Sequence, residues 1–146
     1  MSGGILLVDD DPDVLIVLKI ILEGEGYSVY TVNNLDQAKA IVTEYKICLA
    51  IIDFILPGCH GKQVARALKE IDEKLQIIFL SGHEDVFEAV NDLEFDVYRV
   101  FIKPENIDEL LSAIRSIYIE ENSRHKFHNP YTKIVKGNVG GQLPHL

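Results

Sequence analysis

The sequence predicts an α/β domain in which a five-stranded parallel sheet carries helices on both faces. Short apolar runs alternate five times with segments of helical spacing, which favours parallel strands joined by crossover helices. Most strand candidates are apolar throughout, as expected for strands buried on both faces. A length of 146 residues and a hydrophobic content of 47% allow one domain with a real core.

The first β–α unit begins with the apolar run at residues 5–8, which predicts a strand. Asp11 is placed to cap a following helix, and Pro12 suits the first helical position. Leucine and isoleucine then repeat at helical spacing. Gly24 and Gly26 predict the end of this helix.

The second unit contains a short strand at residues 28–32 and a helix that reaches about Tyr45. Asn34 is followed three residues later by Gln37, a spacing that resembles a capping box. Residues 47–52 then form the most apolar run of the chain and predict the third strand.

The third unit continues with a loop that contains Pro57, Gly58 and Gly61. Residues 64–71 have the apolar spacing of an amphipathic helix. Residues 76–80 predict a fourth strand.

The last units are a short helix at residues 86–93, a fifth strand at 97–102 and a final helix. Asn106 is placed to cap that helix, and its apolar face includes Leu110 and Ile117.

The organised pattern predicts a domain at residues 4–119, followed by a polar tail or linker at residues 120–146. The net charge of -9 disfavours nonspecific nucleic-acid binding, and no helix-turn-helix pattern follows residue 119, so we expect no direct nucleic-acid contact from this chain. The apolar runs are too short or too interrupted to cross a membrane, and residues 1–4 show no secretory signal. We therefore expect a cytoplasmic protein in which Cys48 and Cys59 are free thiols.

Polar residues of four kinds stand at the carboxyl ends of four predicted strands: Asp9 with Asp10, Asp53, Ser81 and Lys103. In an open parallel sheet these ends share one edge, where ligand sites are commonly built. Each residue taken alone has an ordinary explanation as a turn residue or ion-pair partner. Three neighbouring carboxylates repel one another unless a cation lies between them, and oxygen ligands favour Mg²⁺. These groups together suit phosphoryl transfer. A carboxylate can accept the phosphoryl group, while Mg²⁺, the ammonium and the hydroxyl each interact with one of its oxygens.

Four motifs surround these residues: Val8-Asp9-Asp10-Asp11-Pro12, Ile52-Asp53 with Leu56-Pro57-Gly58 and Gly61, Leu80-Ser81-Gly82, and Ile102-Lys103-Pro104. In their order, over about residues 4–118, they resemble the receiver domains of two-component response regulators. The resemblance implies a doubly wound, flavodoxin-like receiver fold.

The resemblance also implies roles for these residues. Asp53 would be the phosphoacceptor, and Ser81 and Lys103 would hold the phosphoryl group. The ligands of Mg²⁺ would be Asp9, Asp10, Asp53 and the backbone carbonyl of Ile55.

The function implied is a switch rather than an enzyme, with at most self-phosphorylation and self-dephosphorylation activity. A sensor histidine kinase or a phosphotransfer protein would supply the phosphoryl group to Asp53, whose modification is relayed as a conformational signal in a two-component phosphorelay. The resemblance also allows a homodimer through the last helix and its neighbouring strand. Two alternatives remain: a Mg²⁺-dependent phosphohydrolase with an aspartyl nucleophile, and a degenerate receiver that only docks. Ile55 argues against the hydrolase, because such enzymes normally place a second Asp there.

One departure from the family concerns Val100, which stands where receivers usually carry the Tyr or Phe of an aromatic switch. Phe101 is expected on the opposite face of the strand. We hypothesise that signalling relies on the loop at residues 81–85 and that Val100 only fills space. Ile55 and His83 flank the path of attacking water in this family, so we predict slow hydrolysis of the phosphorylated form unless His83 positions that water.

Overall fold

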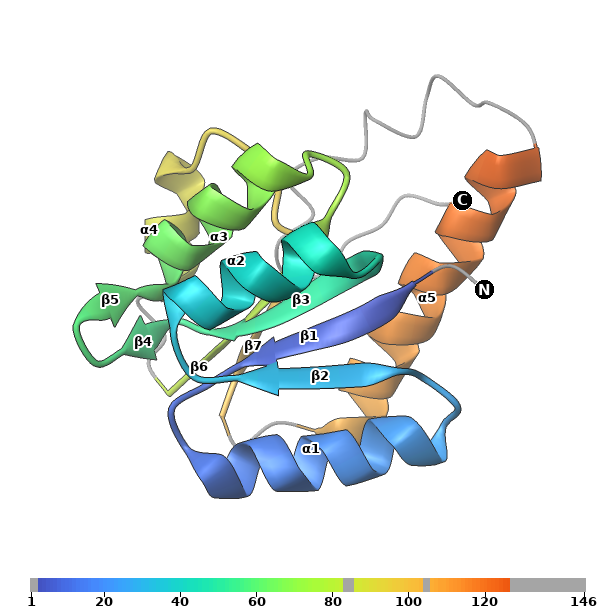
Figure 1. The fold of residues 1–146 in the computed structure, drawn as a ribbon, viewed down its shortest axis with the longest axis horizontal. Coiled ribbons are helices and arrows are strands. Elements are labelled where there is room, and N and C mark those ends of the chain that lie inside the picture. Colours follow the sequence, from blue (N-terminus) through green and yellow to red (C-terminus); the bar gives the residue numbers. More distant parts are fainter. Residues whose placement is uncertain (1–2, 83–85, 104–105, 127–146) are drawn as a thin grey trace.

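A parallel sheet of five strands, in the order β2-β1-β3-β6-β7, forms the centre of the computed structural model, which describes residues 3–82, 86–103 and 106–126 (Figure 1). The strands are β1 (Gly4–Val8), β2 (Val29–Val32), β3 (Ile47–Asp53), β6 (Gln76–Ser81) and β7 (Arg99–Ile102). All four pairings between them are parallel. The chain adds β2 on one side of β1 and every later strand of the sheet on the other, so the sheet is doubly wound, as predicted.

Helices cover both faces of this sheet (Figure 1). One face carries α1 (Pro12–Gly24) and α5 (Ile107–Lys126). The other carries α2 (Leu35–Glu44), α3 (Gly61–Ile71) and the one-turn helix α4 (Val86–Ala89). The observed helices differ from the predicted ones mainly at α4, which is shorter than predicted, and at α5, which extends further.

Strand β1 shows how the apolar runs build two cores. Leu6 and Val8 join the core under α2 and α3, whereas Ile5 and Leu7 join the core under α1 and α5. All four are at most 1% exposed. A strand covered on both faces buries every side chain, which explains why its sequence is apolar without alternation.

The predicted helix starts at Asp11 and Asn34 are confirmed. The Asp11 side chain accepts a hydrogen bond from the Asp13 N–H at 2.9 Å. The Asn34 side chain accepts from the Gln37 N–H at 2.9 Å, and Gln37 Oε1 accepts from the Asn33 N–H at 3.3 Å. These side chains satisfy N–H groups at the helix starts that have no partner within the helix.

The predicted loop after β3 contains a small antiparallel hairpin. Its strands are β4 (Ile55–Leu56) and β5 (Cys59–His60). Pro57 and Gly58 form the turn, and Gly58 has φ 72°, which suits the third position of a type II turn. Strands of two residues are too short to show an alternating pattern, so the sequence indicated only a loop.

The later elements are shorter or longer than predicted. The helix expected at residues 86–93 consists of α4 and a 3-10 helix at Val90–Asp92. Strand β7 begins at Arg99 because only Arg99–Ile102 pair with β6. The predicted domain boundary at residue 119 falls inside α5, which continues to Lys126. That boundary remains a prediction, since residues 127–146 lie outside the described residues.

Two further findings concern composition. Among the described residues, no helix combines the length and apolar character needed to cross a membrane. Cys48 and Cys59 are free thiols, as predicted, the first buried and the second half-buried.

Candidate functional site

The carboxyl ends of the central strands bring the predicted polar residues to one edge of the sheet. Val8 at the end of β1 pairs with Ile52, and Asp53 at the end of β3 pairs with Leu80. Lys103 directly follows β7. This register explains why residues far apart in sequence meet here.

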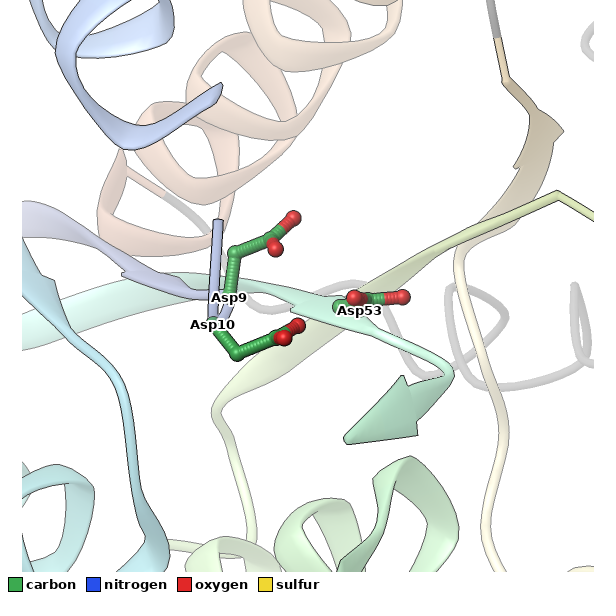
Figure 2. Close-up of side chains that lie close together, drawn as sticks. All are labelled: Asp9, Asp10 and Asp53. Atoms are coloured by element: carbon green, nitrogen blue, oxygen red, sulfur yellow. The ribbon is translucent and has the colours of Figure 1, made fainter. Parts of the chain in front are cut away.

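Three carboxylates form an acidic cluster at this edge, consisting of Asp9, Asp10 and Asp53. One carboxylate oxygen of each lies within 4.8 Å of the others. Figure 2 shows the three side chains close together at the strand ends, the first two from the end of β1 and the third from β3. Asp9 is 3% exposed and Asp53 is 8% exposed, whereas Asp10 is exposed.

Lys103 contacts two members of the acidic cluster. Its Nζ lies 3.1 Å from Asp9 Oδ2 and 3.6 Å from Asp53 Oδ2. The remaining oxygens accept backbone hydrogen bonds: Asp9 Oδ1 from the Asp11 N–H at 2.9 Å and Asp53 Oδ1 from the Ile55 N–H at 3.3 Å. One ammonium therefore faces three carboxylates, and the cluster keeps a net negative charge when all are ionised.

Burial and charge shift the ionisation of Asp53 and Lys103. Burial raises the pKa of Asp53 to about 6, and the negative charge of Asp9 adds to this, while the Lys103 ammonium opposes it. Burial lowers the pKa of Lys103, but Asp9 and Asp53 together outweigh burial and the net shift is upward. At neutral pH the lysine is charged and Asp53 is mainly ionised.

The donor set of the acidic cluster fits a hard divalent cation. It offers carboxylate oxygens and neither nitrogen nor sulfur, which suits Mg²⁺ better than zinc or copper. The excess negative charge gives such an ion a favourable electrostatic environment. Ile55 follows two residues after Asp53, and its side chain is 53% exposed at the rim of the cluster.

Ser81 lies at the same edge but is fully buried, at 0% exposure. Its carbonyl accepts a hydrogen bond from the Lys103 N–H at 2.6 Å, so the backbones that carry the hydroxyl and the ammonium are joined directly. His83, predicted to flank the water path, and Pro104 lie outside the described residues.

Val100 occupies the core on the α3 and α4 side of the sheet. It is 5% exposed and belongs to the cluster that contains Phe79, Val86 and Val90. Phe101 belongs to the cluster on the opposite face, which confirms the predicted alternation. An aliphatic side chain thus fills this part of the core.

The start of α3 is packed directly on the backbone of the acceptor strand, a feature that sequence reasoning missed. The Gly61 N–H donates to the Phe54 carbonyl at 2.7 Å. A Cβ at Gly61 would lie 2.7 Å from the Asp53 carbonyl oxygen, so only glycine fits here. His60 caps α3 together with Gln63, and this three-residue spacing was the available signal.

The chain matches the family model described as the response regulator receiver domain over residues 5–115. It is 33% identical over 115 residues to the uncharacterized transcriptional regulatory protein YkoG of Bacillus subtilis, covering 79% of this chain and 50% of YkoG. It is 30% identical to sporulation initiation phosphotransferase F of the same organism, covering 79% of this chain and 93% of that protein. The chain therefore spans about half the length of YkoG and of the response regulator MtrA of Mycolicibacterium smegmatis.

Solved structures agree with this match. The signal receiver domain of an HD domain-containing protein from Pseudomonas fluorescens superposes with a TM-score of 0.76 at 26% identity, covering 84% of this chain and 99% of that domain. The response regulator TrrA from Thermotoga maritima, solved in complex with Mg²⁺ and BeF, gives a TM-score of 0.69 at 28% identity, covering 78% and 97% of the two chains. On its sequence match, its fold and the arrangement of its strand ends, this chain belongs to the family of response regulator receiver domains.

Proposed function

We propose that this receiver domain accepts a phosphoryl group on Asp53 from a histidine kinase or a phosphotransfer protein. The observation that carries the proposal is the surroundings of Asp53. It ends the central strand β3, has the Lys103 ammonium 3.6 Å from its Oδ2, and shares a cluster with two other acids. In this reaction a carboxylate oxygen of Asp53 bonds to phosphorus, the bond from phosphorus to the donor imidazole nitrogen breaks, and the imidazole leaves.

The other residues of the edge would balance the charge of the phosphoryl group. The Lys103 ammonium, which contacts Asp9 and Asp53, would form a charge-assisted hydrogen bond to a phosphoryl oxygen. The buried Ser81 hydroxyl would donate a hydrogen bond to another oxygen when its loop moves. The conformational signal would pass through the loop that follows Ser81, whose residues 83–85 lie outside the described residues, with Val100 as a passive core residue.

A bound Mg²⁺ ion would supply positive charge that neutralises the transferred group. Asp9, Asp10 and Asp53 would hold the ion through their carboxylates, with the backbone carbonyl of Ile55 as a further ligand. The chemistry of the acidic cluster supports this assignment.

Two features argue against the alternatives. Ile55 stands where an aspartyl phosphohydrolase normally needs a second acid, and its apolar side chain cannot transfer a proton. This favours a long-lived phosphorylated state with slow self-dephosphorylation. A domain that only docks would have no use for the acidic cluster and Lys103, because unneeded buried charges lower stability.

A surface beside the acidic cluster supports docking of a phosphoryl donor. Helix α1 begins directly after the Asp9 turn, and it exposes three aliphatic side chains on one stripe: Ile16, Val17 and Ile20, each more than half exposed. Exposed apolar stripes are typical of protein contacts. We infer that the histidine-bearing partner lays an apolar helix face on this α1 stripe. Homodimerisation through α5 and β7 remains a separate proposal, which sedimentation of the free and phosphorylated protein tests.

Acetyl phosphate with Mg²⁺ tests the proposed function directly. We expect stable incorporation of one phosphoryl group in the wild-type chain, none in Asp53→Asn, and the modified peptide to contain Asp53. Continuous release of phosphate would indicate a hydrolase instead. Absence of labelling in the folded wild type would indicate a docking domain, and labelling of another residue would overturn the assignment of Asp53.

A further inference from the structure

His60 lies where the hairpin after β3 joins α3, and it makes three separate contacts there. In the β4–β5 ladder it pairs with Ile55. Its Nδ1 accepts a hydrogen bond from the Lys62 N–H at 3.2 Å, and its own N–H donates to Gln63 Oε1 at 2.8 Å. Capping of α3 uses only the imidazole nitrogen and the backbone, so it does not require an aromatic ring.

The ring of His60 makes its own contact with Phe54, the residue that follows Asp53. The two rings meet edge to face, with centroids 4.4 Å apart and an interplanar angle of 81°. Phe54 is 3% exposed and also meets Phe79 edge to face, at 5.1 Å. The Phe54 ring is therefore held by His60 and by Phe79 on the neighbouring strand β6, a geometry that aromatic pairs favour.

The backbone of Phe54 is fixed as firmly as its ring. Its N–H donates to the Leu80 carbonyl at 2.8 Å, and its carbonyl accepts from the Gly61 N–H at 2.7 Å. A displacement of Phe54 that reaches its backbone would strain both bonds and shift the peptide units on either side. One of these units joins Phe54 to Asp53, and the other joins it to Ile55, whose carbonyl is the next one along the chain.

We propose that His60 is a positioning residue for the acidic cluster, which acts through the Phe54 ring and its pairing with Ile55. The inference rests on the proposed function in assuming that Asp53 and the Ile55 carbonyl hold the cation. Residues that orient metal ligands commonly change metal affinity tenfold or more when they are removed. In this role the imidazole ring, rather than its capping nitrogen, sets the affinity of the cluster for Mg²⁺.

Two substitutions separate the ring from the cap. His60→Asn keeps a side-chain oxygen that can cap α3 and removes the ring. His60→Phe keeps a ring against Phe54 and removes the capping acceptor. Asn34→Ala is the control, because it also removes a side-chain N-cap, that of α2, and leaves the contact of His60 with Phe54 unchanged.

The measurements are the Mg²⁺ dissociation constant, from an NMR titration with magnesium chloride alone, and the melting temperature in EDTA. We expect His60→Asn to raise the dissociation constant about tenfold and to lower the melting temperature by no more than the two capping variants do. We expect His60→Phe and Asn34→Ala to lower the melting temperature by about 4 °C, with Mg²⁺ affinity close to that of the wild type.

Wild-type affinity in His60→Asn would overturn the proposal, as would affinity losses that follow the melting temperatures across all three variants. Acetyl phosphate labelling separates this inference from the proposed function. If the wild type is not labelled, the proposed function fails, while the Mg²⁺ titrations still decide the role of His60. If it is labelled, we expect His60→Asn to need more Mg²⁺ for half-maximal labelling and to approach the wild-type rate at saturation.

Discussion

The two ends of strand β1 differ in how their polar groups are satisfied. At the carboxyl end, Asp9 shares one ammonium with Asp53 and leaves net negative charge inside the domain. At the amino end, the Gly3 carbonyl accepts a hydrogen bond from the Tyr118 hydroxyl at 2.9 Å, and the Gly4 N–H donates to the Lys46 carbonyl at 2.9 Å. These groups at the amino end are neutral and paired.

This difference separates the parts of the strand that stabilise the fold from those that serve the site. Neutral hydrogen bonds between buried groups each contribute about 1 kcal/mol to stability. Like charges held together in a buried cluster lower the stability of the free protein and raise its affinity for a cation. We therefore expect removal of the polar group to stabilise the protein at the carboxyl end and to destabilise it at the amino end.

The largest effect is expected for Gly61→Ala, next to the carboxyl end. The added Cβ would lie 2.7 Å from the Asp53 carbonyl oxygen and 2.8 Å from Phe54 Cα, so α3 must move away from β3. Overpacking against backbone predicts a loss of about 3 kcal/mol in the free energy of unfolding, with reduced labelling. Gly24→Ala is the control, because nothing lies within 4 Å of a Cβ at Gly24. Urea unfolding measures both, and equal small effects would contradict the close approach.

Asp53→Asn is expected to stabilise the protein in EDTA while abolishing labelling. The raised pKa of Asp53, from 3.8 to about 6, corresponds to about 3 kcal/mol before solvent screening, so we expect a gain of about 1–2 kcal/mol at neutral pH. Because the folded protein binds this proton more tightly than the unfolded chain, stability from this group falls as the pH rises through this range.

The pH profile makes this prediction specific. The gain of Asp53→Asn over the wild type should grow between about pH 4 and pH 6 and stay constant above that range. Unfolding curves at several pH values measure it. Added Mg²⁺ should reduce the gain by stabilising the wild type. A gain that is independent of pH, or a loss of stability, would show that the ionised Asp53 carboxylate does not destabilise the folded protein.

Tyr118→Phe should show the opposite sign at the amino end. It removes the hydrogen bond to the Gly3 carbonyl and keeps the ring, which lies 4.8 Å from the Tyr27 ring between centroids. We expect a loss of about 1 kcal/mol in the free energy of unfolding, with unchanged Mg²⁺ affinity. Tyr45→Phe, at an exposed tyrosine, is the control. A change in Mg²⁺ affinity would mean that the two ends of β1 are coupled.

The same contrast explains which features were predictable from sequence. Asp9, Asp53 and Lys103 were predicted to converge because each follows an apolar run, and parallel register brings such ends together. The β4–β5 hairpin and the contact of His60 with Phe54 were not predicted, since two-residue strands show no periodicity and ring contacts leave no sequence pattern. The contact of Tyr118 with Gly3 spans almost the whole domain and was also not predictable.

The smallest effect concerns the two thiols, whose reaction rates report how accessible each end of the sheet is to a reagent. Cys48 is 5% exposed beside Gly3, and burial raises its pKa to about 11. Cys59 is half-buried on the hairpin near the acidic cluster. Because the thiolate is the reactive form, we expect iodoacetamide to modify Cys59 well before Cys48 at neutral pH, with little change in stability. Peptide mass spectrometry over time measures the two rates. Comparable rates would show that the reagent reaches Cys48 as readily as Cys59. The neutral hydrogen bonds at the amino end of β1 would then not protect that end from local opening.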